Sequence, residues 1–169
     1  MTKKILLAIT GVLLIVLLLV GTVLGVLRSQ RTAGTEIGSV NTAFKLGGSD
    51  RISVESVEDP DVANVVCTLS RARVGGTHGN LGIAEDKSDA HVSCALLGPV
   101  KFRASLAQQE DIVTEKLNTT TKTLHLTRIV DREHNTLSYL VYSDRITDGS
   151  PKHDVSLVVI PRDNPIPVH

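Results

Sequence analysis

A run of 23 residues without a charged side chain, Ile5 to Leu27, most constrains how this chain can fold. The run is flanked by basic side chains, namely Lys3, Lys4, Arg28 and Arg31. As a helix it would be about 34 Å long, enough to cross a hydrocarbon core of about 30 Å. We therefore expect residues 1–31 to be a membrane anchor with its flanks, residues 32–160 a separate domain, and residues 161–169 an irregular tail that contains prolines.

Two other interpretations of the run stay open. A cleaved signal peptide shares the basic start, but its apolar region is usually only about 7–15 residues long and ends at a small-residue cleavage site. Residues Gly21–Gly25 match such a site poorly. A buried core helix needs other long helices to cover its apolar surface, and the sequence predicts none. Because basic residues flank both sides, the positive-inside rule favours a cytoplasmic N-terminus only slightly.

Charge and composition exclude several partners for the domain. The chain has 18 basic and 18 acidic residues, and removing the four basic residues beside the apolar run leaves 14 basic against 18 acidic, a net of −4. Such a domain does not suit nucleic acid, because binding to phosphates requires basic side chains. The chain has no tryptophan and only two tyrosines and two phenylalanines. The core must therefore be built from Val, Leu, Ile and Ala, and stacking platforms for bases are missing.

Short runs of alternating apolar and polar residues, separated by turn residues, recur along the domain. The expected strands are Ile37–Phe44, Arg51–Val57, Ala63–Ser70, Ala90–Leu96, Thr121–Val130, Thr136–Ser143 and Asp154–Ile160. The last is almost wholly apolar, which favours a central place in its sheet. Ala104–Lys116 is expected to hold one short helix, because Gln108 follows Ser105 at the spacing of a capping box. We predict a mainly β fold, an antiparallel β-sandwich or barrel with one short helix, preceded by a single N-terminal transmembrane helix.

The two cysteines, Cys67 and Cys94, are each expected on the apolar side of a strand. If the domain lies outside the cytoplasm, a buried disulfide follows, and a loop of about 28 residues closed in this way stabilises by about 3.6 kcal/mol. Two inert buried thiols are the alternative. A metal site is not expected, because neither cysteine has a partner at C-x-x-C spacing.

No motif in the sequence carries a defined reaction. The glycine-rich segment Gly75–Gly82 matches neither phosphate-binding pattern, so a structural loop is the better interpretation. Asp59 and Asp61 have the character of turn residues rather than an acid/base pair. There is no G-x-S-x-G elbow for a nucleophilic serine. We therefore expect no catalytic residue, no cofactor and no metal.

Several short motifs, taken in order, resemble the bacterial CreA family (catabolite regulation protein A). They are Glu36–Val40 with Phe44–Lys45, Asp59–Val62, Ser70–Ala72 with Gly75–Gly76, Ala84–Asp89, Ser93–Cys94 with Gly98–Pro99, Tyr139–Asp144 and Gly149–Lys152. The resemblance implies a small envelope protein, typically periplasmic with a cleaved leader, of undetermined biochemical function. It supports the Cys67–Cys94 disulfide, because both cysteines match family positions. The long apolar segment and the stretch Ala104–Thr123 depart from the family pattern.

We expect a single-pass protein of the bacterial inner membrane with its domain in the periplasm, or a soluble periplasmic protein if the leader is cleaved. The expected function is non-enzymatic, as a binding or accessory protein for an envelope protein or a small ligand. The candidate binding loop holds Arg71, Arg73, His78, Glu85, Asp86 and Asp89. The simpler alternative is that these side chains only hold an irregular loop in place. A hydrolase or metal-dependent enzyme that uses the same loop is the second hypothesis.

Overall fold

The chain divides after Arg31, and the fold is that of the second unit, Thr32–His169. The computed structural model describes residue 13 and residues 34–44, 48–75, 90–117, 123–144 and 152–169. Apart from residue 13, the expected membrane anchor falls on residues outside these ranges. Within them, no helix is long and apolar enough to span a membrane.

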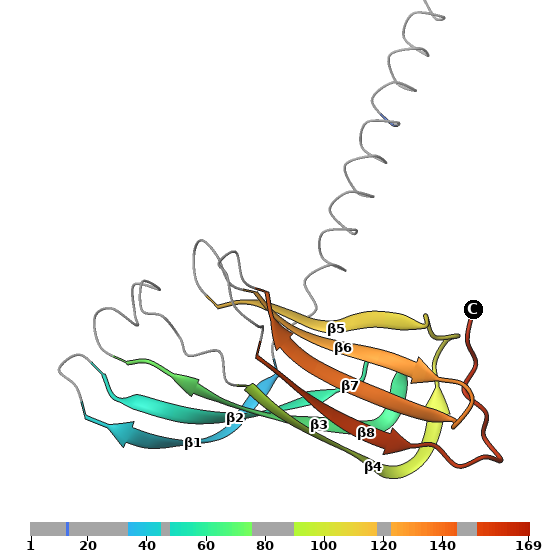
Figure 1. Cartoon of the computed structure of the whole chain (residues 1–169), viewed down its shortest axis with the longest axis horizontal. Helices are drawn as coiled ribbons and strands as arrows, with labels where there is room; N and C mark the ends of the chain where they lie inside the picture. Colours follow the sequence, from blue (N-terminus) through green and yellow to red (C-terminus); the bar gives the residue numbers. More distant parts are fainter. Residues whose placement is uncertain (1–12, 14–33, 45–47, 76–89, 118–122, 145–151) are drawn as a thin grey trace, which may run out of the picture. The chain divides into compact units, whose positions relative to one another are not determined.

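Eight strands in the described residues form two antiparallel sheets that lie as two layers (Figure 1). The first sheet has the order β1 (Thr35–Ala43), β2 (Asp50–Glu58), β3 (Val62–Arg73) and β4 (Ala90–Phe102). The second has the order β5 (Gln109–Lys116), β6 (Thr123–Asp131), β7 (Thr136–Ser143) and β8 (His153–Val159). Within each sheet, every strand thus pairs with its neighbour along the chain, and the prediction of a mainly β fold, an antiparallel β-sandwich or barrel, is confirmed as two antiparallel sheets.

The predicted short helix within Ala104–Lys116 is wrong. Residues Gln109–Lys116 form strand β5, and Leu106 makes an isolated bridge to Val168. The side chain of Gln108 donates to the carbonyl of Val130 instead of capping a helix. A register shift between Asp111 and Val113 puts two consecutive buried residues in the strand. The sequence therefore lacks the regular alternation by which a strand is predicted.

The predicted central place of the last strand is also wrong, because β8 pairs only with β7 and lies at the edge of its sheet. Its apolar residues Val155, Leu157 and Val159 are exposed on the outer face. The residues that alternate with them are less exposed: Asp154 and Ser156 are polar, and Val158 is buried in the core. The apolar run therefore belongs to an edge strand with one uncovered apolar face.

The apolar core fills the space between the sheets. Val65, Cys67 and Leu69 of β3 face Leu126 and Val141 of the second sheet, and all are at most 1% exposed. Burial of this aliphatic surface is the main driving force for folding.

The expected disulfide is confirmed, with Cys67 bonded to Cys94. The two cysteines are direct register partners of β3 and β4. The bond therefore cross-links two paired strands within the first sheet.

Side chains of β8 tie the two sheets together along one edge. The backbone N–H of Val92 donates to Asp154 Oδ2 at 3.0 Å, and that of Cys94 donates to Ser156 Oγ at 2.8 Å. β4 and β8 accordingly lie side by side (Figure 1). At the other edge of the first sheet, all nine residues of β1 are exposed. The sandwich is thus joined at the β4–β8 edge and uncovered at β1.

The connections between strands alternate between the two ends of the sandwich. The last residues of β1, β3, β5 and β7 lie at one end, which we call the loop end; they are Ala43, Arg73, Lys116 and Ser143. The short β2–β3 turn and the β6–β7 hairpin lie at the opposite end. Asp131 and Thr136 are paired at the closed end of the β6–β7 hairpin, where Asn135 has φ 55°.

Candidate functional site

The inner face of the first sheet changes from apolar to charged towards the loop end. Along β3, the alternation that buries Cys67 and Leu69 continues to Arg71 and Arg73. The neighbouring strand β2 pairs Ser53 with Arg71. Two arginines therefore occupy positions where the pattern calls for apolar core residues.

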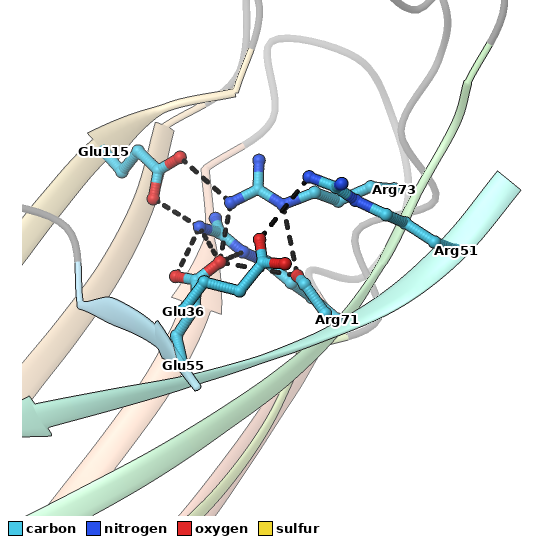
Figure 2. A network of polar contacts seen from close by, with 7 residues as sticks. Glu36, Arg51, Glu55, Arg71, Arg73 and Glu115 are labelled. Atoms are coloured by element: carbon cyan, nitrogen blue, oxygen red, sulfur yellow. Dashed lines mark hydrogen bonds and ion pairs between the residues drawn. The ribbon is translucent and has the colours of Figure 1, made fainter. Parts of the chain in front are cut away.

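These arginines belong to an arginine–glutamate cluster, defined as Ser53, Glu55, Arg71, Arg73 and Glu115 (Figure 2). Arg71 donates from Nε and Nη2 to Glu55 Oε1 at 3.2 and 2.8 Å, and from Nη2 to Glu55 Oε2 at 2.7 Å. Arg73 donates from Nη2 to Glu55 Oε1 at 2.6 Å and from Nε to Ser53 Oγ at 3.1 Å. One carboxylate thus joins both guanidinium groups.

The second carboxylate of the cluster comes from the other sheet. Glu115 lies near the end of β5, and its Oε2 accepts from Arg71 Nη2 at 2.6 Å. Its Oε1 lies 3.9 Å from Arg73 Nη2. Glu115 therefore connects the two layers at the loop end.

The side chains of the cluster become more exposed to solvent from Glu55 and Arg71 towards Glu115 and Arg73. The side chains of Glu55 and Arg71 are 3% and 6% exposed, whereas those of Glu115 and Arg73 are 22% and 32% exposed. Beside the cluster lies a more exposed rim pair, Arg51 and Glu36, with Arg51 Nη2 3.4 Å from Glu36 Oε2 (Figure 2). The cluster is thus closed at Glu55 and reached by solvent at Arg73 and Glu115.

The ion pairs keep the inner groups charged despite burial. Burial alone raises the pKa of Glu55, but hydrogen bonds from Arg71 and Arg73 outweigh it and leave that pKa below its usual value. Burial alone lowers the pKa of Arg71, yet hydrogen bonds to Glu115 and Glu55 leave it raised. Both groups are therefore ionised at neutral pH.

One nitrogen of Arg71 is left over. Its Nη1 atom is buried and has no hydrogen-bond partner among the described residues. An unpaired buried donor on a charged group is costly, because it has lost water without gaining a partner. The cluster therefore contains one unfilled hydrogen-bonding position.

This arrangement suits binding better than proton transfer. Guanidinium groups stay protonated at physiological pH and offer planar forks that match carboxylates. Glu55, with its lowered pKa and its bonds to both arginines, is a poor general base near neutral pH. Chemically, the cluster can hold and orient an anionic group.

A second charged group, the Arg128 cluster, lies nearer the opposite end of the core. Fully buried Arg128 donates to Asp59 Oδ1 at 2.7 Å, Asp61 Oδ2 at 3.2 Å and Glu110 Oε2 at 2.9 Å. Tyr139 donates its hydroxyl to Asp59 Oδ2 at 2.7 Å. The expected turn role of Asp59 is confirmed, since Asp61 N donates to its Oδ1 at 2.8 Å. Its contacts with Arg128 and Tyr139 give it a second, cross-sheet role.

A third polar group lies on the outer face of the second sheet. His125 Nδ1 is 2.8 Å from Asp111 Oδ2, and Nε2 is 3.6 Å from Asp144 Oδ2. The imidazole stacks on Tyr142 with ring centroids 4.9 Å apart. Among the described residues, no group of three His, Cys, Asp or Glu side chains is arranged to hold a metal ion.

The structure places two of the six predicted loop residues. Arg71 and Arg73 lie on strand β3 rather than in a loop, and they meet in the arginine–glutamate cluster. The other four, His78, Glu85, Asp86 and Asp89, fall outside the described residues. Gly75 packs closely on the chain before β2, since an added Cβ would overlap the carbonyl oxygen of Ser49.

Sequence reasoning missed the acidic partners Glu55 and Glu115. Along β2 the apolar residues Ile52 and Val54 alternate with Ser53 and Glu55, so the sequence pattern favours the wrong face, and the structure buries Ser53, Glu55 and Val57 instead. Glu115 follows the register shift in β5, and no signal in the sequence places it opposite Arg71.

Comparison with known proteins places this fold and its clusters in a family. Residues 37–163 match the family model described as "CreA protein". The chain belongs to the CreA family. "Protein CreA" of Escherichia coli strain K12 is 45% identical over 130 residues, which cover 74% of this chain and 83% of that protein. "Protein CreA" of E. coli O157:H7 matches with the same identity and coverage.

The CreA match spans most of the structure described above. It contains strands β2 to β8 and therefore the disulfide, the arginine–glutamate cluster and the Arg128 cluster. Of the rim pair, Glu36 lies just before the matched range. No solved structure matches the chain.

Proposed function

We propose that this CreA-family chain is a non-enzymatic binding or accessory protein of the cell envelope, which holds a ligand or partner at the loop end through Arg71 and Arg73. The observation that carries the proposal is the graded burial of the cluster, from Glu55 at 3% exposure to Arg73 at 32%. A purely structural ion pair gains little stability from a second arginine, such as Arg73, that is held beside solvent. A recognition site benefits from this arrangement, because the charged side chains that bind a ligand must be held in the right orientation and remain accessible to it.

The disulfide and the apolar run support a location outside the cytoplasm. Disulfides persist in oxidising compartments such as the periplasm and are rare where thiols are kept reduced. Cys67 and Cys94 form one in the core of the domain. The uncharged run Ile5–Leu27 has the length of a membrane-spanning helix. We therefore include in the proposal a domain in the periplasm, anchored to the inner membrane by this segment.

The location is tested with a reporter fused after His169. Alkaline phosphatase, which requires an oxidising compartment, should be active in this fusion, and Cys67 and Cys94 should resist alkylation in freshly lysed cells. A reporter that is active only as a cytoplasmic fusion, together with alkylated cysteines, would overturn the envelope location.

The binding site is tested by proximity labelling in intact cells with the anchored full-length chain. Arg73→Gln removes the exposed arginine of the cluster, and Arg132→Gln makes the same change at an exposed position of the β6–β7 hairpin. The labelled proteins or ligands should be retained with Arg132→Gln and lost with Arg73→Gln. Identical labelling by both variants and the unchanged chain would exclude the loop end as the binding site.

A further inference from the structure

Glu115 is held less firmly than Glu55, although both bind Arg71. Glu55 accepts four hydrogen bonds from Arg71 and Arg73, and its side chain is 3% exposed. Among the described residues, the Glu115 carboxylate accepts one hydrogen bond, from Arg71 Nη2, and its side chain is 22% exposed. It also lies next to Lys116, the last residue of β5. Of the two carboxylates, Glu115 is the one that can leave.

The donors beside Glu115 are not fully used. Arg71 Nη2 is shared between Glu55 and Glu115, while the adjacent Nη1 has no partner among the described residues. A carboxylate that approaches a guanidinium end-on accepts one hydrogen bond from each Nη atom. Glu115, which reaches across from the other sheet, satisfies Nη2 only. Glu115 therefore leaves one hydrogen-bond donor of Arg71 without an acceptor.

Arg128 offers a comparison within the same molecule. Its Nε atom is also buried without a partner, but both of its Nη atoms bind carboxylates and its side chain is 0% exposed. At Arg71 the nitrogen without a partner among the described residues is a terminal Nη atom, next to the one that binds Glu115, whereas at Arg128 both terminal nitrogens already bind carboxylates.

On these contacts we propose that Arg71 and Arg73 form a receptor for the carboxylate of an acidic ligand, and that Glu115 occupies the ligand's place in the free protein. The proposal deepens the function proposed above and rests on it. The ligand carboxylate displaces Glu115 and takes hydrogen bonds from both Nη atoms of Arg71. Arg73, still bound to Glu55, faces the incoming charge. Once displaced, the Glu115 carboxylate is hydrated, because it lies near the solvent-accessible end of β5.

An internal competitor lowers the apparent affinity of a ligand by the fraction of time that it fills the site. Removing the charge of Glu115 should therefore tighten binding. Glu115→Gln and Glu36→Gln each raise the net charge by one, but only the first acts on a group bonded to Arg71. Comparing the two separates displacement from general attraction of anions.

The test is a titration of the full-length chain in detergent micelles at physiological ionic strength. Glutarate supplies a free carboxylic acid, acetylated and amidated triglutamate supplies a peptide carboxylate, and glutaramide is the uncharged control. Calorimetry gives the affinity, and the Nε–Hε NMR signals of Arg71 and Arg73 report the site. Unfolding curves check that each variant is folded.

We expect saturable binding of glutarate or triglutamate, movement of both arginine signals and no binding of glutaramide. Glu115→Gln should tighten binding about tenfold or more, Arg73→Gln should weaken it by a similar factor, and Glu36→Gln should leave it unchanged. The tighter of the two acids identifies the source of the carboxylate. If neither binds, or if Glu115→Gln and Glu36→Gln act alike, the receptor proposal fails. Should proximity labelling nevertheless depend on Arg73, the binding function stands and only the ligand class is wrong.

Discussion

Asp59 shows how much one buried carboxylate organises in this domain. It accepts hydrogen bonds from Arg128 Nη1, from the hydroxyl of Tyr139 and from the backbone of Asp61 and Val62. Burial, and then the charge of Asp59, raises the pKa of Tyr139 above its usual value, so the phenol stays protonated and donates. A single residue of the β2–β3 turn thereby fixes two side chains of the opposite sheet.

Removing either partner of Asp59 should destabilise the domain by different amounts. Tyr139→Phe removes one hydrogen bond to a charged group and should cost about 1.5–3 kcal/mol. Arg128→Met leaves Asp59 buried without its cation and should cost about 3–5 kcal/mol. Urea unfolding measures both. Arg132→Met, at the exposed hairpin, should change stability by less than about 0.5 kcal/mol, and losses that do not exceed this control would contradict the role of Asp59.

At the same residue scale, the sequence predicted some buried positions and not others. The inward direction of Cys67 and Cys94 followed from alternation, because small apolar residues on either side agreed with it. The buried charges Glu55 and Arg128 were missed, because a charged residue is assigned to the solvent side unless its partner is known. For Arg128 the partners come from β5 and the β2–β3 turn, and this pairing exists only in three dimensions.

At the scale of whole elements, β5 and β8 show the limits of periodicity. Turn signals and alternation located every strand of the two sheets except β5. A register shift in β5 made the pattern resemble a helix. In β8 three apolar residues, Val155, Leu157 and Val159, are exposed, while Asp154 and Ser156 bind β4 and Val158 lies in the core. Composition alone does not distinguish such an edge strand from a central one.

The β4–β8 edge should open locally when its side-chain acceptors are removed. Ser156→Ala takes away the acceptor of the Cys94 N–H, and should cost about 1 kcal/mol. Hydrogen exchange should speed up at Cys94 and at neighbouring Val92, while amides of the β6–β7 pair keep their protection. Ser138→Ala, on the outer face of β7, provides the control. Equal exchange at Cys94 in both variants would show that Ser156 does not hold this edge.

The β3–β4 pair should depend on its disulfide. With a sequence separation of 27 between the cysteines, loss of the bond should lower the free energy of unfolding by about 3.6 kcal/mol in the chain-entropy model. Urea unfolding of the oxidised and the reduced wild type measures the bond alone, and the Cys67→Ala, Cys94→Ala double variant adds the loss of buried sulfur. A reduced protein as stable as the oxidised one would mean that residual pairing of β3 and β4 already restricts the conformations of the unfolded chain.

At the scale of the whole molecule, an aliphatic core lies between two sets of internal ion pairs, so its stability is tied to pH. Glu55 carries much of this dependence, because Arg71 and Arg73 hold its pKa below the usual value of 4.5 against the effect of burial. A carboxyl group with a lowered folded pKa contributes stability that is fully present above its unfolded pKa. That contribution is lost as the pH falls through the folded pKa, which here lies below 4.5.

Glu55→Gln should therefore be most destabilising at neutral pH, by up to about 3–5 kcal/mol, because it leaves two arginines short of a counter-charge. The difference between wild type and variant should stay constant from neutral pH down to about 5 and then shrink as the pH falls further, because wild-type Glu55 is protonated there too. Urea unfolding from pH 7 to 3 measures this difference, with exposed Glu133→Gln as the matched control. A gap that stays the same down to pH 3 would mean that the arginines do not depend on the charge of Glu55, and the ionic account of the cluster would have to be abandoned.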